Sequence, residues 1–254
     1  MYTNLFHLVS TGKVATQWFN SLFDKLDKET QYKMVKWITV KHKNKHVFLG
    51  ARTMNPSVVN LNSNTFYYNV NYDYNSFINK IKLNDDNYCG IYIYRDPREY
   101  VMSAYYSWMF SHPGGHEKRK YIRTLSKDDG LKYVIDQTKS WNEWDMIRSW
   151  GEAKNDKIIK LKFEDIFGTD EKQANMIKFL NKELDLKISD DKLNNIISQM
   201  NFKNFSGGRK QGETNNNHHY RNGKELTWKS EMSEDVLKHF YDITGDLVNI
   251  LGYE

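Results

Sequence analysis

The chain has 254 residues, which is enough for one large domain with a real hydrophobic core, and we predict a single domain over residues 1–254. Hydrophobic residues make up 39% of the chain and aromatic residues 15%, which is typical of a globular enzyme and excludes a disordered chain. The net charge of +5 comes from scattered lysines without a basic arm, so we expect a small polyanionic ligand and no nucleic acid.

The single cysteine, Cys89, lies in an apolar run and indicates a buried core thiol. One cysteine excludes an intramolecular disulfide and a cysteine-based zinc cluster, and the scattered histidines form no metal-binding pattern, so no metal is expected. We find no signal peptide before the first expected strand and no apolar run of membrane-spanning length, so we predict a cytoplasmic protein without a membrane partner. Nothing in the sequence indicates the oligomeric state.

The first informative stretch, residues 4–23, has the pattern of a strand, a turn and a helix. The run from Leu5 to Val9 is typical of a buried strand, and the apolar residues after the turn recur at helical spacing: Trp18, Phe19, Leu22 and Phe23. The amide groups and the dipole at the start of such a helix attract anions. Together with the charge of Lys13 and the hydroxyl of Thr16, this pattern predicts a cradle for a phosphate or sulfate group.

This cradle differs from the phosphate loop of nucleotide triphosphatases, which has the pattern GxxxxGK[ST]. His7 stands where that pattern needs its first glycine, and Val14 stands where it needs a hydroxyl ligand for magnesium. The sequence therefore indicates an anion site that works without a magnesium clamp. An ordinary strand-to-helix turn with a surface lysine is the structural alternative.

The part of the chain between the first stretch and residue 87 carries weaker signals. Its apolar residues predict, in order, a short helix at 29–37, strands at 47–49 and 66–70, and a helix that leads from Phe77 into a turn at 84–87. Asp73 lies just past the second of these strands.

The second informative stretch begins with a strand at 88–94 that is rich in aromatic and β-branched residues. Arg95 follows at its carboxyl end, and Asp96 and Pro97 suit the cap and first turn of a helix that carries Ser103.

Arg95 and Lys13 are expected to reach the same place, because ligands of open α/β sheets bind at the carboxyl ends of the strands. An arginine can hold a phosphate through two parallel N–H bonds. A salt bridge with Asp96 or Glu99 is the structural alternative for Arg95.

The second half of the chain predicts mostly helices. The expected elements are a loop at 111–125 that covers an active site, a long helix or helix pair at 127–150, a strand at 158–161, and helices at 171–182, at 189–199 and from Ser233 onward. Residues 205–231 are polar, glycine-rich and long for an idle connector, which favours a ligand-covering loop. Strands that alternate with helices indicate an α/β fold with a central, mostly parallel sheet flanked by helices.

Three motifs in these stretches resemble those of the sulfotransferases that use 3′-phosphoadenosine-5′-phosphosulfate (PAPS). In the family's order, the corresponding segments are Lys13–Trp18 for [KR]-S-G-T-T-W, Arg95–Ser103 for R-[ND]-P-[RK]-[DE]-x-x-x-S, and Arg221–Lys229 for R-K-G-x-x-G-D-W-K. The similarity covers nearly the whole chain, and residues 163–166 also resemble the family's Y-E-D-L. It implies the sulfotransferase fold, which is similar to that of P-loop nucleotide triphosphatases.

The resemblance implies transfer of the sulfuryl group from PAPS to a hydroxyl or amine of a small-molecule or glycan acceptor, with release of the desulfated product PAP. It implies that Lys13 stabilises the charge on the leaving phosphate and that Arg95, Ser103 and Arg221 bind the 3′-phosphate. The other cofactor-binding positions that it implies are Ala15, Thr16, Gln17, Trp18, Asn222 and Gly223. Trp18 is explained equally well as a core residue.

The chain departs from the family in the first and third motifs. Val14, Ala15 and Gln17 replace Ser, Gly and Thr, and Asn222 replaces Lys, so we expect weaker cofactor binding than the family norm. Two other functions remain open: a non-catalytic protein that binds a nucleotide or sulfated ligand on this fold, and a small-molecule kinase, which the missing magnesium ligand disfavours.

The general base is not fixed by these motifs. The best-known family members carry a histidine at the end of the strand before the 3′-phosphate strand, and the corresponding residue here is Asp73, which we predict to be the base. A cap on the helix that starts near Asn75 is the alternative for Asp73, and the rival bases are His42, His46, His116 and Glu29. No pattern in the loops around 50–65 and 111–125 identifies the acceptor.

Overall fold

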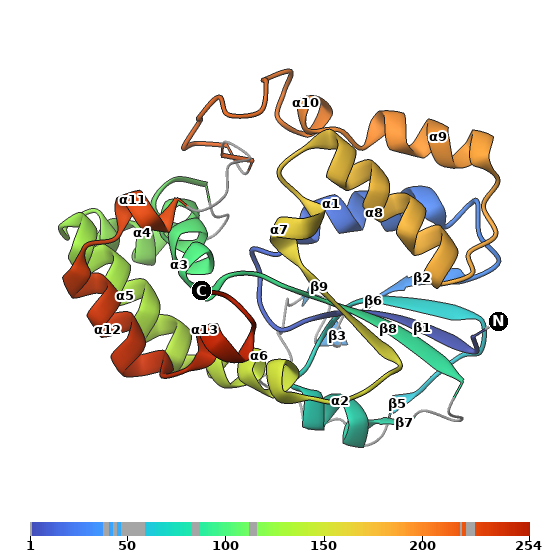
Figure 1. Ribbon diagram of the computed structural model, residues 1–254, viewed down its shortest axis with the longest axis horizontal. Coiled ribbons are helices and arrows are strands. Elements are labelled where there is room, and N and C mark those ends of the chain that lie inside the picture. Colours follow the sequence, from blue (N-terminus) through green and yellow to red (C-terminus); the bar gives the residue numbers. More distant parts are fainter. Residues whose placement is uncertain are drawn as a thin grey trace.

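The computed structural model describes residues 2–37, 41–42, 45–46, 59–82, 87–111, 116–218, 220–221 and 227–254. Its centre is a five-stranded sheet in which all neighbouring strands run parallel, in the order β2-β6-β1-β8-β9 (Figure 1). The strands are β1 (Asn4–Val9), β2 (Lys33–Lys36), β6 (Thr65–Asn71), β8 (Tyr88–Tyr94) and β9 (Ile158–Lys162). The predicted α/β class with a parallel sheet is therefore confirmed.

The central strand β1 pairs with β6 on one side and with β8 on the other. Leu8 of β1 is opposite Val70 of β6 and Tyr92 of β8, so the three strands end at the same edge of the sheet. The segments that follow them emerge side by side at this edge. Two small strand pairs lie outside the sheet: β3 (Lys41–His42) with β4 (Lys45–His46), and β5 (Val59–Asn60) with β7 (Ile81–Lys82).

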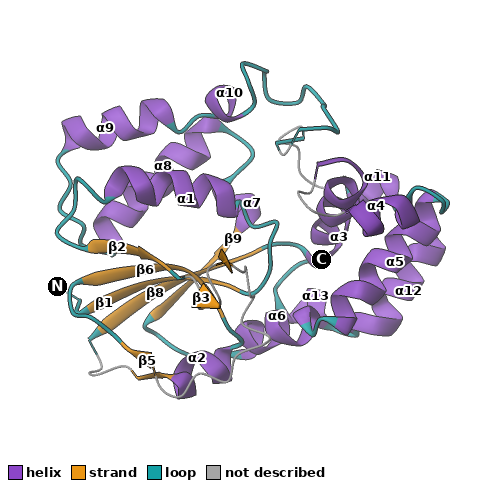
Figure 2. Ribbon diagram, turned by 180° about the vertical axis from the view of Figure 1, so that it is seen from behind, coloured by secondary structure: helices purple, strands orange, loops and turns teal. Residues whose placement is uncertain are grey.

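Helices cover both faces of the sheet (Figures 1 and 2). One face buries Leu5 and Phe66 under α1, α8 and α9, and the other buries Phe6 and Tyr92 under α2 and α6. Burial on both faces explains why the strands are apolar without a strict alternation. The bounds of these helices are α1 (Thr16–Leu26), α2 (Tyr74–Lys80), α6 (Glu143–Glu152), α8 (Asp170–Glu183) and α9 (Asp190–Gln199).

A group of helices with its own core lies beyond the carboxyl edge of the sheet (Figure 1). Val101, Leu131 and Phe240 are fully buried in this core. The group comprises α3 (Pro97–Tyr106), the π-helix η1 (Ser107–Ser111), α4 (His116–Ile122), α5 (Lys127–Ser140), α11 (Trp228–Glu231), α12 (Glu234–Thr244) and α13 (Leu247–Ile250), and two short helices lie elsewhere, α7 (Phe163–Ile166) and α10 (Phe202–Phe205). Among the described residues, no helix has the length and apolar character needed to cross a membrane.

The helix predicted at 29–37 is wrong, because residues 33–36 form β2. These residues pair in parallel with β6, and Met34 and Val35 pack on opposite faces of the sheet. Side chains that alternate between two faces are typical of a strand. With only two apolar residues in the segment, however, the sequence pattern does not distinguish a strand from a helix. The strand predicted at 66–70 is confirmed within β6, and the one predicted at 47–49 lies outside the described residues.

The loop predicted at 111–125 is wrong in part, because α4 occupies 116–122 and buries Ile122 in the helical group. Residues 112–115 lie outside the described part of the chain. The strand predicted at 88–94 is confirmed with the same bounds, and the region 127–150 is a helix pair, α5 and α6. Ser233 caps α12, as the sequence predicts.

The turn between β1 and α1 holds two residues with a side chain in the left-handed backbone region, Lys13 at φ 68° and Ala15 at φ 56°. Ala15 occupies the N-cap position of α1, where it makes no side-chain hydrogen bond. A residue with a Cβ lies roughly 1 kcal/mol higher in energy there than glycine. The family motif has glycine at this position, so the alanine leaves strain in the turn.

Replacing Ala15 by glycine should raise the free energy of unfolding by about 0.5–1 kcal/mol, because relief of the left-handed strain outweighs the greater freedom of glycine in the unfolded chain. Urea unfolding followed by tryptophan fluorescence measures this change. The matched control is Ala153→Gly, since Ala153 has φ −57° and glycine should lower stability there. An Ala15→Gly variant that is no more stable than wild type would contradict the strained conformation.

Candidate active site

The segments after β1 and β8 meet at the carboxyl edge of the sheet. Arg95, directly after β8, donates a hydrogen bond of 3.2 Å from Nη1 to the backbone carbonyl of Lys13. The expected proximity of Arg95 and Lys13 is therefore confirmed. This bond joins the first and second informative stretches, which are far apart in the sequence.

Arg95 is mostly buried but keeps part of its donor capacity. Its side chain is 11% exposed, Nη2 lies 3.5 Å from Oε2 of Glu99, and the guanidinium lies 4.3 Å from the centre of the Phe163 ring. Nε has no hydrogen-bond partner among the described residues, and Oε1 of Glu164 is 3.9 Å away from it. The salt bridge with Glu99, one of the alternatives for Arg95, is present. Because a guanidinium has five N–H donors, this salt bridge does not prevent it from also holding an anion.

The other acidic candidate, Asp96, pairs with a different arginine. Asp96 caps α3 by accepting the backbone N–H of Arg98 at 2.8 Å, as predicted, and its two carboxylate oxygens also accept from the Arg98 side chain. Both side chains are buried, and Nη2 of Arg98 donates to the carbonyl of Glu254 at 2.7 Å. This buried pair fixes the start of α3, the helix that carries Ser103.

Glu99 connects the second stretch to the third. Its carboxylate accepts the backbone N–H of Trp228 at 2.8 Å and the hydroxyl of Thr227 at 3.2 Å, in addition to Nη2 of Arg95. Glu99 is only 2% exposed, so these charge-assisted hydrogen bonds are shielded from water. One carboxylate therefore holds both the arginine after β8 and the end of the segment 205–231.

Arg221 lies against the same helix as Ser103. Its guanidinium stacks 3.9 Å from the centre of the Tyr106 ring, and Nη2 lies 3.6 Å from Oε1 of Glu231. Ser103 and Tyr106 are three residues apart on α3, so they share one face of the helix. This arrangement brings Arg221 to the side of α3 that carries Ser103.

The described part of residues 205–231 folds around Arg209. The guanidinium of Arg209 donates to the carbonyls of Glu213, Tyr220 and Arg221, at 2.8, 2.5 and 2.9 Å. Apart from the last residue of α10 and the short helix α11, the described part of this segment consists of turns and irregular backbone, as the sequence predicts. Its role as a cover over a ligand stays a prediction, and Asn222 and Gly223 lie outside the described residues.

The cradle at the start of α1 contains a buried hydroxyl that can serve an anion. Oγ1 of Thr16 has no hydrogen-bond partner among the described residues, and a buried hydroxyl without a partner is unfavourable. An oxygen of a bound phosphate or sulfate would satisfy it, so the residues present fit such a group. Ala15 precedes Thr16 in the turn, and Gln17 is exposed beside it.

Trp18 is a core residue in this structure. It is 2% exposed, and its indole N–H donates to the carbonyl of Met200 at 3.0 Å. The core role that the sequence allows for Trp18 is therefore present, and its contact with a cofactor stays a prediction.

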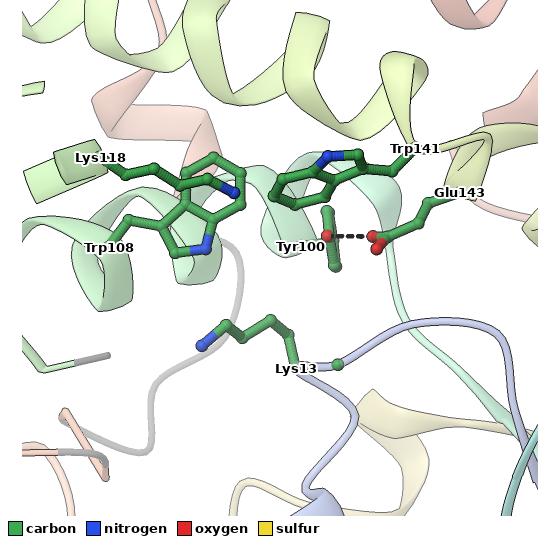
Figure 3. A pocket seen from close by; sticks show the side chains of 7 residues that line it. Lys13, Tyr100, Trp108, Lys118, Trp141 and Glu143 are labelled. Carbon is green, nitrogen blue, oxygen red and sulfur yellow. Dashed lines mark hydrogen bonds between the residues drawn. The ribbon is translucent and has the colours of Figure 1, made fainter. Parts of the chain in front are cut away.

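A cavity of about 170 Å³ lies beside the cradle (Figure 3). The side chain of Lys13 extends from below Tyr100 toward Trp108, and the Tyr100 hydroxyl donates to Oε2 of Glu143 at 2.5 Å. The Lys118 ammonium lies 3.4 Å from the centre of the Trp141 ring. The lining comes from the cradle, α3, η1, α4 and the turn between α5 and α6: Gly12, Lys13, Tyr100, Trp108, Lys118, Trp141 and Glu143.

The electrostatic surroundings of Lys13 distinguish it from an ordinary surface lysine. Burial lowers the pKa of Lys13 to about 8, the charge of Arg95 contributes to this lowering, and the carboxylate of Glu143 opposes it. A lysine whose charged form is disfavoured by burial beside a cavity is typical of a functional site, because a bound anion would compensate for the lost hydration.

Asp73 caps α2 in this structure. Its Oδ1 accepts the backbone N–H of Ser76 at 2.8 Å, which is the alternative role that the sequence allows. The residues that line the cavity do not include Asp73, and its function as the general base stays a prediction.

Glu29 is the one rival base whose side chain is described, and it does not line the cavity. Glu29 lies past the end of α1, the helix that starts at the cradle, and its carboxylate is 2.7 Å from Nζ of Lys192. His42, His46 and His116 fall outside the described side chains.

Sequence reasoning did not assign a role at the site to Tyr100, Lys118 or Glu143. Tyr100 lies near the start of α3, after Arg95, and Glu143 follows a left-handed residue, Asn142 at φ 61°, between α5 and α6. No motif marks these positions. The signal that could have found Glu143 is the polar interruption between the two helical patterns of 127–150, where a turn aims side chains out of the helix faces.

Replacing Lys13 by methionine should stabilise the ligand-free protein by about 1–3 kcal/mol at pH 7, because each unit of pKa lowering corresponds to about 1.4 kcal/mol against the charged form. The folded pKa is about 8 and the ordinary value is 10.5, so wild-type stability should rise with pH between these values. The advantage of the variant should therefore be largest below pH 8 and shrink above it.

Thermal and urea unfolding from pH 6 to pH 10 measure this difference. The matched control is Lys120→Met, since the Lys120 side chain is 78% exposed and its removal should change stability little at any pH. A Lys13→Met variant that is less stable than wild type at pH 7 would show that Lys13 is not held at an electrostatic cost.

The fold of this chain is similar to those of solved sulfotransferase-like structures that contain PAP. The mouse sulfotransferase SULT7A1 complexed with PAP superposes with a TM-score of 0.62 at 12% identity, covering 97% of this chain and 84% of that chain. Retinol dehydratase in complex with androsterone and the inactive cofactor PAP superposes with a TM-score of 0.57 at 13% identity, covering 99% of this chain and 82% of that chain. At these identities the likeness shows the fold alone.

Two comparisons used the sequence. A search of curated proteins gave no significant match. The model of the sulfotransferase domain family matches residues 3–252. Because this match spans nearly the whole chain, the protein belongs to the sulfotransferase domain family.

Proposed function

We propose that this protein is a PAPS-dependent sulfotransferase that transfers a sulfuryl group to a hydroxyl or amine of a small-molecule or glycan acceptor and releases PAP. One observation carries this proposal: Arg95 and Glu99 join the cradle, the start of α3 and the end of the segment 205–231 into one cationic site. The cavity beside Lys13 supplies room for an acceptor at that site. We propose that the reaction takes place in the cytoplasm.

Arg95, Ser103 and Arg221 would hold the 3′-phosphate. Arg95 and Arg221 provide planar groups of N–H donors that suit phosphate oxygens, and Ser103 provides a hydroxyl from the face of α3 that Arg221 reaches. The neighbouring positions Asn222 and Gly223 would contribute from the covering segment, as the family motif implies.

Lys13, Thr16 and the amide groups at the start of α1 would hold the 5′-phosphosulfate, with Ala15 and Gln17 flanking them. Trp18 would pack near the adenine. PAPS, when bound, supplies the sulfuryl group and a phosphate leaving group. Lys13 would neutralise the charge that grows on the leaving phosphate oxygen, and a preorganised cation of this kind lowers the barrier without moving during the reaction.

A non-catalytic binding protein is the main competing function. Binding of the 3′-phosphate would use Arg95, Ser103 and Arg221, but it would not need a lysine that lines the neighbouring cavity. The position of Lys13 therefore favours catalysis. Val14 in place of a magnesium-binding hydroxyl speaks against a kinase.

A thermal-shift comparison separates these functions. PAP should raise the melting temperature of the wild-type protein, whereas ATP with magnesium should not. Turnover of radiolabelled PAPS with phenols, alcohols, amines and glycans then distinguishes an enzyme from a binding protein and identifies the acceptor class. Stabilisation by ATP with magnesium but not by PAP would overturn the proposal.

Replacing Arg95 by alanine should weaken PAP binding by roughly 1.5–3 kcal/mol, the range for a hydrogen bond to a charged group. Isothermal titration calorimetry measures the loss, with a melting curve to verify folding. The matched control is Arg123→Ala, because Arg123 is exposed and lies in the segment after α4. Unchanged PAP affinity in a folded Arg95→Ala protein would remove Arg95 from the binding site.

Replacing Lys13 by alanine should lower turnover by about a hundredfold or more, which is the effect of losing one preorganised electrostatic donor. PAP affinity should fall far less, because the charge that Lys13 neutralises develops only in the transition state. Single-turnover rates with saturating PAPS report this difference. A rate equal to wild type would show that Lys13 lies near the site but takes no part in catalysis.

A further inference from the structure

We propose that Glu143 is the general base that takes the proton from the sulfuryl acceptor, an inference that rests on the proposed function. Among the described residues that line the cavity beside Lys13, Glu143 is the only carboxylate. In Figure 3, Glu143 lies beside Tyr100, and the Lys13 side chain lies below them with its ammonium directed toward Trp108. The residue that must neutralise the leaving group and a residue that can accept a proton thus face the same space.

The chemistry of transfer needs such a group. As the acceptor oxygen bonds to sulfur, its O–H bond breaks and Glu143 accepts the proton. The bond between sulfur and the bridging oxygen of the 5′-phosphate breaks at the same time, and that oxygen keeps the electron pair beside Lys13. Glu143 later releases the proton to water. A positioned base typically contributes about 10²–10⁴ to the rate of such a step.

One hydrogen bond and the backbone around it position the Glu143 carboxylate. The Tyr100 hydroxyl donates to its Oε2 at 2.5 Å. The left-handed residue Asn142 turns the chain between α5 and α6, so that Glu143 begins α6 next to the cavity. Trp144 anchors this turn, because its side chain is 4% exposed and its indole N–H donates to the carbonyl of Ile135 at 3.2 Å. A carboxylate has about four acceptor positions, so the bond from Tyr100 leaves it able to accept a proton.

The charges around the cavity agree with this placement. The cations that line it are Lys13, from the cradle, and Lys118, whose ammonium lies against the Trp141 ring. Glu143 raises the pKa of Lys13 against the effects of burial and of Arg95, which means that its carboxylate acts on Lys13 through space. Asp73 lacks these relations, and its Oδ1 is engaged in capping α2.

The experiment compares Glu143→Gln with two other changes of carboxylate to amide. Glu152→Gln is the matched control, because Glu152 lies on the same helix and its side chain is 57% exposed. Asp73→Asn tests the rival base. The rate measured is single-turnover hydrolysis of saturating PAPS to PAP and sulfate, in which water takes the place of the acceptor, so the acceptor need not be known. PAP affinity is measured by calorimetry on every variant.

We expect Glu143→Gln to slow PAPS hydrolysis at least about a hundredfold, with PAP affinity within about threefold of wild type, while Glu152→Gln keeps the wild-type rate. A second readout does not depend on activity. The pKa of Lys13, followed by NMR of ¹³C-methylated lysines, should fall below its wild-type value in Glu143→Gln and stay unchanged in Glu152→Gln, because the neighbouring negative charge is lost only in the former. Glu143→Asp, which keeps the charge, should recover part of the rate and decides the question if Glu143→Gln does not fold.

A wild-type rate in Glu143→Gln would overturn this inference alone, and a loss confined to Asp73→Asn would in addition identify Asp73 as the base. An unchanged pKa of Lys13 in Glu143→Gln would also overturn it, because the carboxylate would then not face Lys13. A wild-type protein that neither binds PAP nor consumes PAPS would overturn the proposed function, and the inference with it.

Discussion

The buried contact between Arg95 and Glu99 is the interaction on which the arrangement of the site depends. Glu99 accepts hydrogen bonds from Arg95, Thr227 and Trp228, and Arg95 reaches the carbonyl of Lys13. Segments from the beginning, middle and end of the chain therefore share one small network. The separation of 3.5 Å between Arg95 and Glu99 is at the long end for a hydrogen bond, so the pair compensates charge while a ligand phosphate can still compete for the guanidinium.

The cradle concentrates features that do not favour folding. Lys13 is held with a lowered pKa, Lys13 and Ala15 adopt left-handed backbone angles, and the hydroxyl of Thr16 is buried without a partner among the described residues. A bound anion would compensate the buried charge of Lys13 and would satisfy the hydroxyl of Thr16. The sheet, which buries apolar residues on both faces, supplies the stability that such a site needs. Local strain at a site supported by a regular core is the pattern expected of a binding or catalytic centre.

The sequence predicted best those parts of the fold whose signals are local. The strand at 88–94 has the predicted bounds because an apolar run is closed by the turn signals of Arg95, Asp96 and Pro97. The strand β2 was missed because its conformation depends on pairing with β6, more than 25 residues away, and its own few apolar residues fit either period. The helix α4 was missed because its charged residues have the composition of a loop.

In the candidate site, too, the sequence predicts the residues that belong to local motifs and misses those that only the tertiary structure brings together. The candidate anion-binding residues Lys13, Arg95, Ser103 and Arg221 could be proposed because they belong to motifs. The cavity wall could not, because Tyr100, Trp141 and Glu143 are ordinary helix residues until the turn at Asn142 and the packing of α3 bring them together. A carboxylate near the start of a helix is common in any sequence, and only its position opposite Lys13 gives it a chemical meaning.

The measurement that tests the central claim most directly is calorimetric titration of the wild-type protein with PAP and with adenosine 5′-monophosphate. The two ligands differ only in the 3′-phosphate, which the account assigns to Arg95, Ser103 and Arg221. Two arginine contacts of the charge-assisted kind should make PAP bind at least about tenfold more tightly, which corresponds to about 1.4 kcal/mol. Equal affinities for the two ligands would contradict the claim that the three segments joined by Arg95 and Glu99 form one binding site for the 3′-phosphate.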